Sequence, residues 1–235
     1  MVADALIYHP TVSHYLKFIA TTVGRDKLLR TLQYFSRFLA WYLYRTNRPQ
    51  SSISPFEATK KQFGATRKLM RVGKFVEHFR AAAVASDAKS MDPVLRFCTV
   101  GRQLGYAAYM LLDNACVLDA TGIRKFGAAT RMLREGYRAW FMGLSFSIAS
   151  GIYSYYGLSL RAKAIAQSSE PEKVVEKKKV EKELNAVKVQ LLSDLCDITI
   201  PSSALGWAEL DDGMVGLAGT TSSLLGVWGQ WKKTA

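Results

Sequence analysis

The sequence predicts an all-α, membrane-associated helical bundle, and three observations support this prediction. Apolar residues recur at spacings of three and four along most of the 235-residue chain, as they do on the faces of helices. Hairpin signals such as Asn-Gly are absent. Two stretches, residues 139–160 and 213–231, contain no Asp, Glu, Lys, Arg or His, and the first would form about 33 Å of helix. We therefore predict a single helical domain, residues 1–235, with about two transmembrane helices.

Aromatic residues near the ends of both uncharged stretches favour a transmembrane interpretation. Trp140 and Tyr156 lie near the ends of the first stretch, and Trp228 and Trp231 lie near the end of the second. Such amphipathic rings prefer the interface between lipid and water. The alternative is burial in a soluble bundle, because small and hydroxyl residues dilute both stretches.

Cap signals and hydrophobic periodicity predict the remaining helices. Ser54, Pro55 and Glu57 form the pattern of a helix start, and Asp92 followed by Pro93 forms another. The predicted segments are N-terminal helices within residues 1–54, a basic amphipathic helix at 55–85, an apolar helix at 93–119 and a second amphipathic helix at 171–198.

The net charge of +13, from 32 Lys and Arg against 19 Asp and Glu, suits an anionic partner such as nucleic acid or a lipid surface. Residues 1–138 carry 22 basic and 9 acidic side chains, whereas residues 161–212 carry 8 and 10. If both uncharged stretches cross a membrane, the positive-inside tendency places both termini in the cytosol. Nucleic-acid binding is disfavoured, because the cations accompany apolar helical faces and no nucleic-acid-binding motif is present.

The sequence indicates no catalytic, metal or cofactor site. Cys98, Cys116 and Cys196 are scattered and form no CxxC pair, so neither a zinc site nor a disulfide framework is predicted. Gly-rich phosphate loops and the motifs of hydrolases and metalloproteases are absent. A non-enzymatic protein is therefore expected.

The predicted helix at 55–85 carries an apolar face with a basic flank, which is the pattern of a helix that lies in the headgroup plane. Insertion of this kind wedges one leaflet apart and bends the membrane. The alternative is that the same face packs into the protein core, and periodicity does not separate the two. The predicted membrane-binding residues are Lys60, Arg67, Leu69, Arg71, Val72, Lys74, Phe75, Val76 and Phe79.

Small residues at four-residue spacing predict close helix packing, either within the chain or between copies of it. The predicted helix-packing residues are Gly101, Gly105, Gly143, Ser147 and Gly151.

Several short segments resemble the fungal peroxin-11 family, and the likeness extends over nearly the whole chain. The segments are Tyr8-His9-Pro10, Gly24-Arg25-Asp26-Lys27, Leu32-Gln33-Tyr34, Arg37-Phe38-Leu39, residues 191–197 and Leu205-Gly206-Trp207.

This resemblance implies a peroxisomal membrane protein that inserts an amphipathic helix, elongates the organelle, self-associates as a homo-oligomer and helps to recruit the dynamin-related fission GTPase with its membrane adaptors. Its lipid partners would be anionic. Family members have also been regarded as pore formers, so a channel for small metabolites is the second interpretation. The polar content of residues 139–160 motivates it, with Ser147, Ser154 and Tyr155 as the expected lining.

Overall fold

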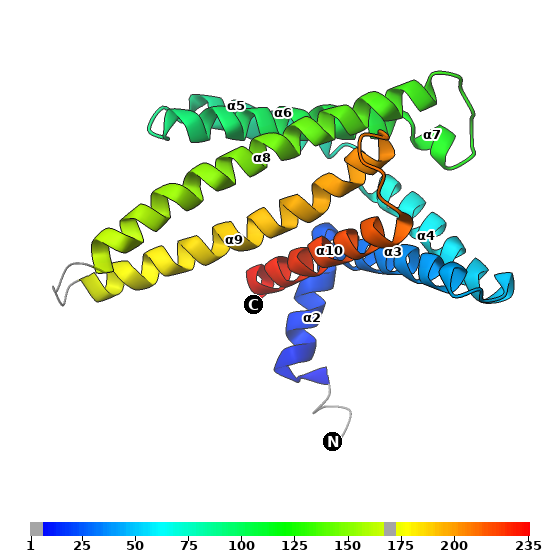
Figure 1. Cartoon of the computed structure of the whole chain (residues 1–235), viewed down its shortest axis with the longest axis horizontal. Helices are drawn as coiled ribbons and strands as arrows, with labels where there is room; N and C mark the ends of the chain where they lie inside the picture. The colour runs from blue at the N-terminus through cyan, green and yellow to red at the C-terminus, as the bar shows by residue number, and fades with distance from the viewer. Residues whose placement is uncertain (1–6, 167–172) are drawn as a thin grey trace.

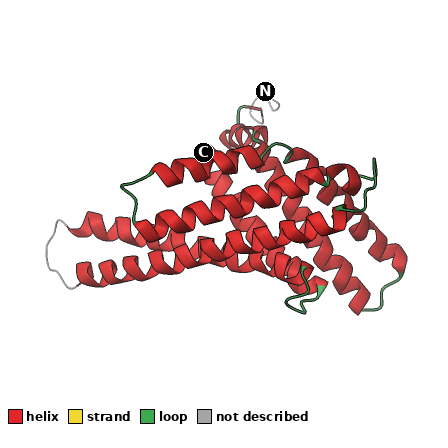
Figure 2. Ribbon diagram, turned by 90° about the horizontal axis from the view of Figure 1, so that it is seen from above, coloured by secondary structure: helices red, strands yellow, loops and turns green. Residues whose placement is uncertain are grey.

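The computed structural model describes residues 7–166 and 173–235, and all regular structure in these two ranges is helical (Figures 1 and 2). The helices are α2 (Pro10–Ala20), α3 (Thr22–Arg45), α4 (Gln50–Met70), α5 (Phe75–Asp87), α6 (Pro93–Ala115), α7 (Val117–Ala120), α8 (Ala129–Ala166), α9 (Lys173–Ala204) and α10 (Asp212–Thr234).

The long helices pack as two groups. In the first, which we name the α3 group, α3 contacts α2, α4 and α10. In the second, the α6 group, α6 packs against α5 and α8, and α8 packs against α9. Figure 1 shows α5, α6 and α8 running together along one side, with α3, α4 and α10 on the other. Contacts of α9 with α10, and smaller ones of α4 with α6 and α7, join the groups.

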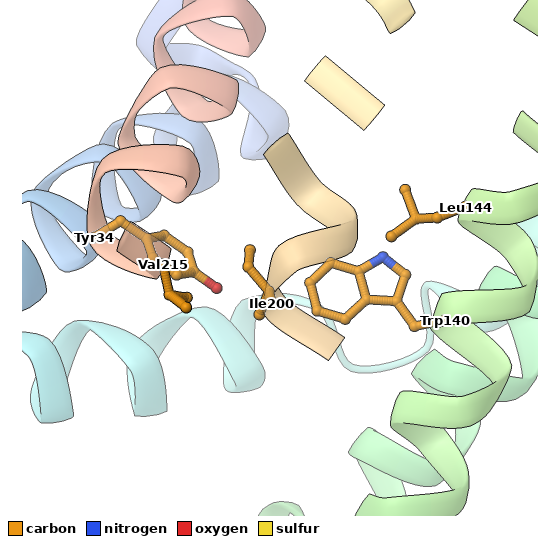
Figure 3. Close-up of a cluster of buried hydrophobic side chains, with 5 residues drawn as sticks. All are labelled: Tyr34, Trp140, Leu144, Ile200 and Val215. Carbon is orange, nitrogen blue, oxygen red and sulfur yellow. The ribbon is translucent and has the colours of Figure 1, made fainter. Parts of the chain in front are cut away.

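A small apolar cluster lies where the two groups meet. Tyr34 of α3, Trp140 and Leu144 of α8, Ile200 of α9 and Val215 of α10 are all buried there (Figure 3). The N-terminal helix α3 and the three consecutive C-terminal helices α8, α9 and α10 therefore share one core.

The predicted helix at 55–85 is two helices, which corrects the sequence-based boundaries. α4 already begins at Gln50 and α5 ends at Asp87, so Pro55 lies inside α4 instead of at its start. Residues 71–74 form a turn, in which Gly73 has φ +82°. Glycine adopts this left-handed conformation without a steric penalty, so the helix breaks there.

The other boundaries also shift. The predicted apolar helix at 93–119 is divided into α6 and α7, and Asp92 caps α6 by accepting hydrogen bonds from the amides of Val94 and Leu95 at 2.9 and 3.1 Å. The predicted helix at 171–198 corresponds to α9, which continues to Ala204; residues 171 and 172 lie outside the described residues.

The prediction of transmembrane helices at 139–160 and 213–231 is not supported. Among the residues that the structure describes, no helix combines the length and the hydropathy needed to cross a bilayer. The two segments lie within α8 and α10, where small residues occupy many of the buried positions. Gly143, Ser147, Ser222 and Ser223 are examples. These residues allow close helix contact but contribute little apolar surface.

Candidate membrane-binding surface

An exposed apolar face runs from the end of α4 across the 71–74 turn to α5. Leu69, Val72, Val76 and Phe79 are 52%, 60%, 57% and 43% exposed, respectively. Phe75 is half-buried, and its ring lies edge-on to that of Phe79 with centroids 6.3 Å apart. We name these five residues the apolar face. Their exposure distinguishes them from Ala82 and Ala85, which are buried on the same helix α5.

The basic flank of this face is held by acidic residues of the chain itself. Arg67 is buried, and its Nε donates to Oδ1 of Asp26 at 3.0 Å, while its Nη1 donates to Oε1 of Gln33 at 2.7 Å. Nη2 of Arg71 lies 3.4 Å from Oδ2 of Asp113. These contacts fix the end of α4 against α3 and α6.

Two further lysines of α4 are held in the same way. Lys68 forms a second ion pair with Asp113, which is 3% exposed. Nζ of Lys60 lies 3.3 Å from Oδ2 of Asp212, and the other oxygen of this carboxylate accepts from Nη2 of Arg37 at 2.6 Å. Lys60 is therefore attached to the start of α10.

Lys60, Arg67 and Arg71 therefore form ion pairs within the chain. The sequence had predicted that these three cations face lipid headgroups. Lys74 differs, because it is half-buried and forms no ion pair with any residue that the structure describes. Four of the five predicted apolar residues are thus exposed, whereas most of the predicted cations hold this part of the chain in place.

Neighbouring charges shift the pKa values of the acids in these pairs. Burial alone would raise the pKa of Asp26, but the guanidinium groups of Arg67 and Arg71 outweigh it and hold the pKa below the ordinary value of 3.8. Arg37 and Lys60 lower the pKa of Asp212 against the same opposing effect of burial.

The predicted helix-packing residues lie at contacts between helices of one chain. A Cβ atom at Gly105 of α6 would stand 2.7 Å from the backbone of Gly143 of α8, and one at Gly101 would stand 2.6 Å from the Phe146 ring. A Cβ atom at Gly151 would meet Leu191 of α9 at 2.5 Å. At Gly105 a larger residue would collide with backbone, whereas at Gly101 and Gly151 it would displace the side chains of Phe146 and Leu191.

Ser147 connects α8 with α9 through a buried hydrogen bond. Its hydroxyl donates to Oδ2 of Asp194 at 2.6 Å. Burial raises the pKa of Asp194, and the hydrogen bond from Ser147 opposes this shift. Of the other residues expected to line a channel, Ser154 is half-buried and Tyr155 is 40% exposed.

A cleft of about 1230 Å³, which we name the basic cleft, separates the α3 group from the α6 group. Eleven Lys and Arg and four Asp and Glu line it, together with Tyr34, Tyr106, Tyr109 and Trp140. Sequence reasoning missed this cleft, because its walls come from helices that are distant in the chain. The excess of positive charge was the only signal of it in the sequence.

Comparison with known proteins finds one family model and several relatives that point to the same family. Residues 12–231 match the family model of peroxisomal biogenesis factor 11 (PEX11). The chain is 31% identical to peroxisomal membrane protein PMP27 of Saccharomyces cerevisiae, with all of both chains covered. It is 27% identical to peroxisomal membrane protein PMP30B of Candida boidinii, covering 100% of this chain and 99% of the relative. It is also 22% identical to peroxisomal biogenesis factor 11 of Schizosaccharomyces pombe, covering 95% and 96%. No solved structure matches significantly.

Proposed function

Because the chain belongs to the PEX11 family of peroxisomal biogenesis factors, we propose that it works at the peroxisomal membrane, which it elongates by inserting the apolar face of α4 and α5 into one leaflet. Its relatives in Saccharomyces cerevisiae and Candida boidinii are peroxisomal membrane proteins. A role in peroxisome proliferation fits this family.

The observation that carries the proposal is the exposure of Leu69, Val72, Val76 and Phe79 at the end of α4, in the following turn and on α5. Each such side chain gains about 1.5 kcal/mol or more when it is fully transferred from water to an apolar medium. Partial burial of several side chains therefore favours adsorption by several kcal/mol. Burial to a depth of about 5–10 Å is typical of interfacial helices and expands the headgroup region of one leaflet.

The ion pairs of Arg67 and Arg71 make this surface rigid before it meets the membrane. A free amphipathic peptide would lose conformational entropy when it became helical on lipid, whereas α4 and α5 are already fixed against α3 and α6. The attraction to anionic lipid then comes from cations near the face that have no ion-pair partner among the described residues. Lys61, Lys74 and Arg80 are of this kind.

We place both termini on the cytosolic side as part of the same proposal. Copies of the protein would self-associate there and concentrate the wedging effect, and the assembly would recruit the dynamin-related fission GTPase. The family resemblance supports these two steps, and insertion of one apolar face does not depend on them.

The test compares two triple variants of the full-length protein. Leu69→Ser with Val76→Ser and Phe79→Ser removes most of the apolar face, while Ile152→Ser with Leu192→Ser and Leu195→Ser removes equally exposed side chains from α8 and α9. Flotation with anionic vesicles measures binding, and electron microscopy measures vesicle elongation. We expect the first variant to lose both and the control to retain both. Equal binding by the two variants would contradict the proposal.

A further inference from the structure

Cations outnumber carboxylates in the lining of the basic cleft. Arg30, Arg67, Lys68 and Arg71 use their charge in ion pairs with Asp197, Asp26 and Asp113. Seven other cations of the cleft form no ion pair with any residue in the ranges 7–166 and 173–235. They are Lys27, Lys74, Arg102, Lys178, Lys182, Lys232 and Lys233. An excess of positive charge in one cleft attracts mobile or bound anions.

Lys27 is half-buried in the lining of the cleft. Its Nζ approaches Gly226 of α10 so closely that a Cβ atom there would be only 3.0 Å away. Burial, and next to it the charge of Arg30, lowers the pKa of Lys27 to about 8. The carboxylates of Asp197 and Asp26 oppose this shift only in part, and each is itself paired with an arginine, Arg30 and Arg67 respectively. Lys27 therefore presents an only partly compensated positive charge to the cleft.

Arg102 of α6 faces the same cleft from the opposite group of helices. It is half-buried, and its guanidinium carbon lies 5.7 Å from the centroid of the Tyr106 ring. Lys178 and Lys182, one helical turn apart on α9, add two exposed cations to the wall. Cations thus reach the cleft from α3, α6 and α9.

We propose that the basic cleft binds a phosphorylated, multiply charged anion, held by Lys27 and Arg102 inside and by Lys178 and Lys182 on its wall. The cleft is larger than the roughly 300–1,000 Å³ typical of small-ligand sites, so a ligand of that class fits. A phosphate group offers several acceptor oxygens to converging N–H donors, whereas one carboxylate would balance only one of the seven charges. The phosphate could belong to a lipid headgroup or to a soluble organic phosphate, and this binding goes beyond insertion of the apolar face.

Two sets of variants of the full-length protein separate specific binding from general electrostatic attraction. Lys178→Gln with Lys182→Gln removes two cations from the cleft wall. Lys177→Gln with Lys179→Gln removes the same charge from other faces of the same helix, outside the cleft. Lys27→Met keeps the length of the side chain and removes its charge, which should raise the melting temperature of the ligand-free protein because a desolvated charge disappears.

The first measurement titrates each protein with pyrophosphate by calorimetry. We expect saturable binding, weakened about tenfold or more by Lys27→Met and by the double variant at 178 and 182, and nearly unchanged in the double variant at 177 and 179. Absence of saturable binding, or equal weakening in both double variants, would overturn the proposal.

The second measurement identifies the source of the phosphate. Flotation is compared on phosphatidylcholine vesicles that contain either phosphatidic acid or phosphatidylserine. A lipid headgroup ligand predicts that Lys27→Met weakens binding to phosphatidic acid and leaves binding to phosphatidylserine unchanged. If the ligand is a soluble phosphate, Lys27→Met should weaken the binding of pyrophosphate and leave binding to both kinds of vesicle unchanged. Loss of phosphatidylserine binding in the Leu69, Val76 and Phe79 variant reports separately on the apolar face, so the two proposals can fail independently.

Discussion

Arg30 and Asp197 are 167 positions apart in the chain, yet Nη2 of Arg30 lies 2.5 Å from Oδ1 of Asp197 in a buried ion pair. The pair joins α3 to α9 across the basic cleft. The guanidinium also lies 5.4 Å from the centroid of the Tyr34 ring, in the apolar cluster where the two helix groups meet. This contact fixes how the α3 group and the α6 group face one another.

Removal of one partner of this pair should strongly destabilise the protein. Arg30→Met leaves the Asp197 carboxylate buried without its partner, and such losses cost about 3–5 kcal/mol. We expect this decrease in the free energy of unfolding in urea, and substantial recovery when Asp197→Leu is added. For the exposed pair of Arg138 and Glu135, Arg138→Gln should cost less than about 1 kcal/mol. A similar decrease in the free energy of unfolding for Arg30→Met and Arg138→Gln would contradict the burial of the Arg30–Asp197 pair.

The close approach of α6 and α8 should not tolerate a methyl group at Gly105. The new Cβ atom would meet the Gly143 backbone at 2.7 Å, and backbone cannot rotate away as a side chain can. We expect Gly105→Ala to lower the free energy of unfolding by about 1–3 kcal/mol.

Gly157→Ala is the control for this substitution, because Gly157 lies on α8 and a Cβ atom there would meet nothing within 4 Å. Alanine favours helix over glycine by up to about 1 kcal/mol, so this variant should be more stable than the native protein. Destabilisation by both alanines, measured in the same urea titration, would indicate that the helix packing differs from that described.

The ion pair of Asp26 and Arg67 makes stability depend on acid pH. The pKa of Asp26 in the folded protein lies below its ordinary value of 3.8, so the folded state binds this proton less readily than the unfolded state. Its contribution is fully present above pH 3.8 and is lost as the pH falls through the folded pKa. Asp26→Asn should therefore be less stable than the native protein at neutral pH, with a gap that narrows below pH 3.8. Urea unfolding across this range measures the gap; a constant gap would contradict the pairing.

Helical content and the apolar face were accessible from sequence, because both depend on local periodicity. Leu69, Val72, Val76 and Phe79 recur at helical spacing, and all four are exposed although the chain leaves the helical conformation at Gly73 between them. The break itself was missed, because the apolar spacing continues across residues 71–74 although the helical backbone conformation ends there. The start at Ser54 was wrong because residues 50–53 are already helical and pack Ile53 into the interior.

The roles of the cations could not be read from spacing, since their partners are distant in the chain. Arg67 pairs with Asp26, 41 positions away, and Lys68 pairs with Asp113, 45 positions away. A basic flank on a helical wheel therefore looks the same whether it faces lipid or the acids of neighbouring helices. The transmembrane prediction failed for a related reason, because absence of charge in 139–160 and 213–231 does not by itself make a helix sufficiently apolar.

Substitution of the apolar face should leave the fold intact. Because Leu69, Val76 and Phe79 are exposed, changing them to serine removes little buried surface, and surface changes generally alter stability by less than about 0.5 kcal/mol. We expect the triple variant to unfold in urea at nearly the same midpoint as the native protein. A large loss of stability would mean that these side chains pack inside the protein.

The most direct test of the central claim is the depth of residue 76 in a lipid bilayer. A nitroxide on Val76→Cys, with Cys196→Ser to remove the half-buried native thiol, reports collisions with oxygen in lipid and with a nickel chelate in water. With anionic vesicles we predict increased oxygen collisions and loss of nickel collisions at residue 76, and unchanged collisions for the same label on α9 at Lys179→Cys. A label at residue 76 that stays accessible to nickel while the protein floats with the vesicles would contradict insertion of the apolar face.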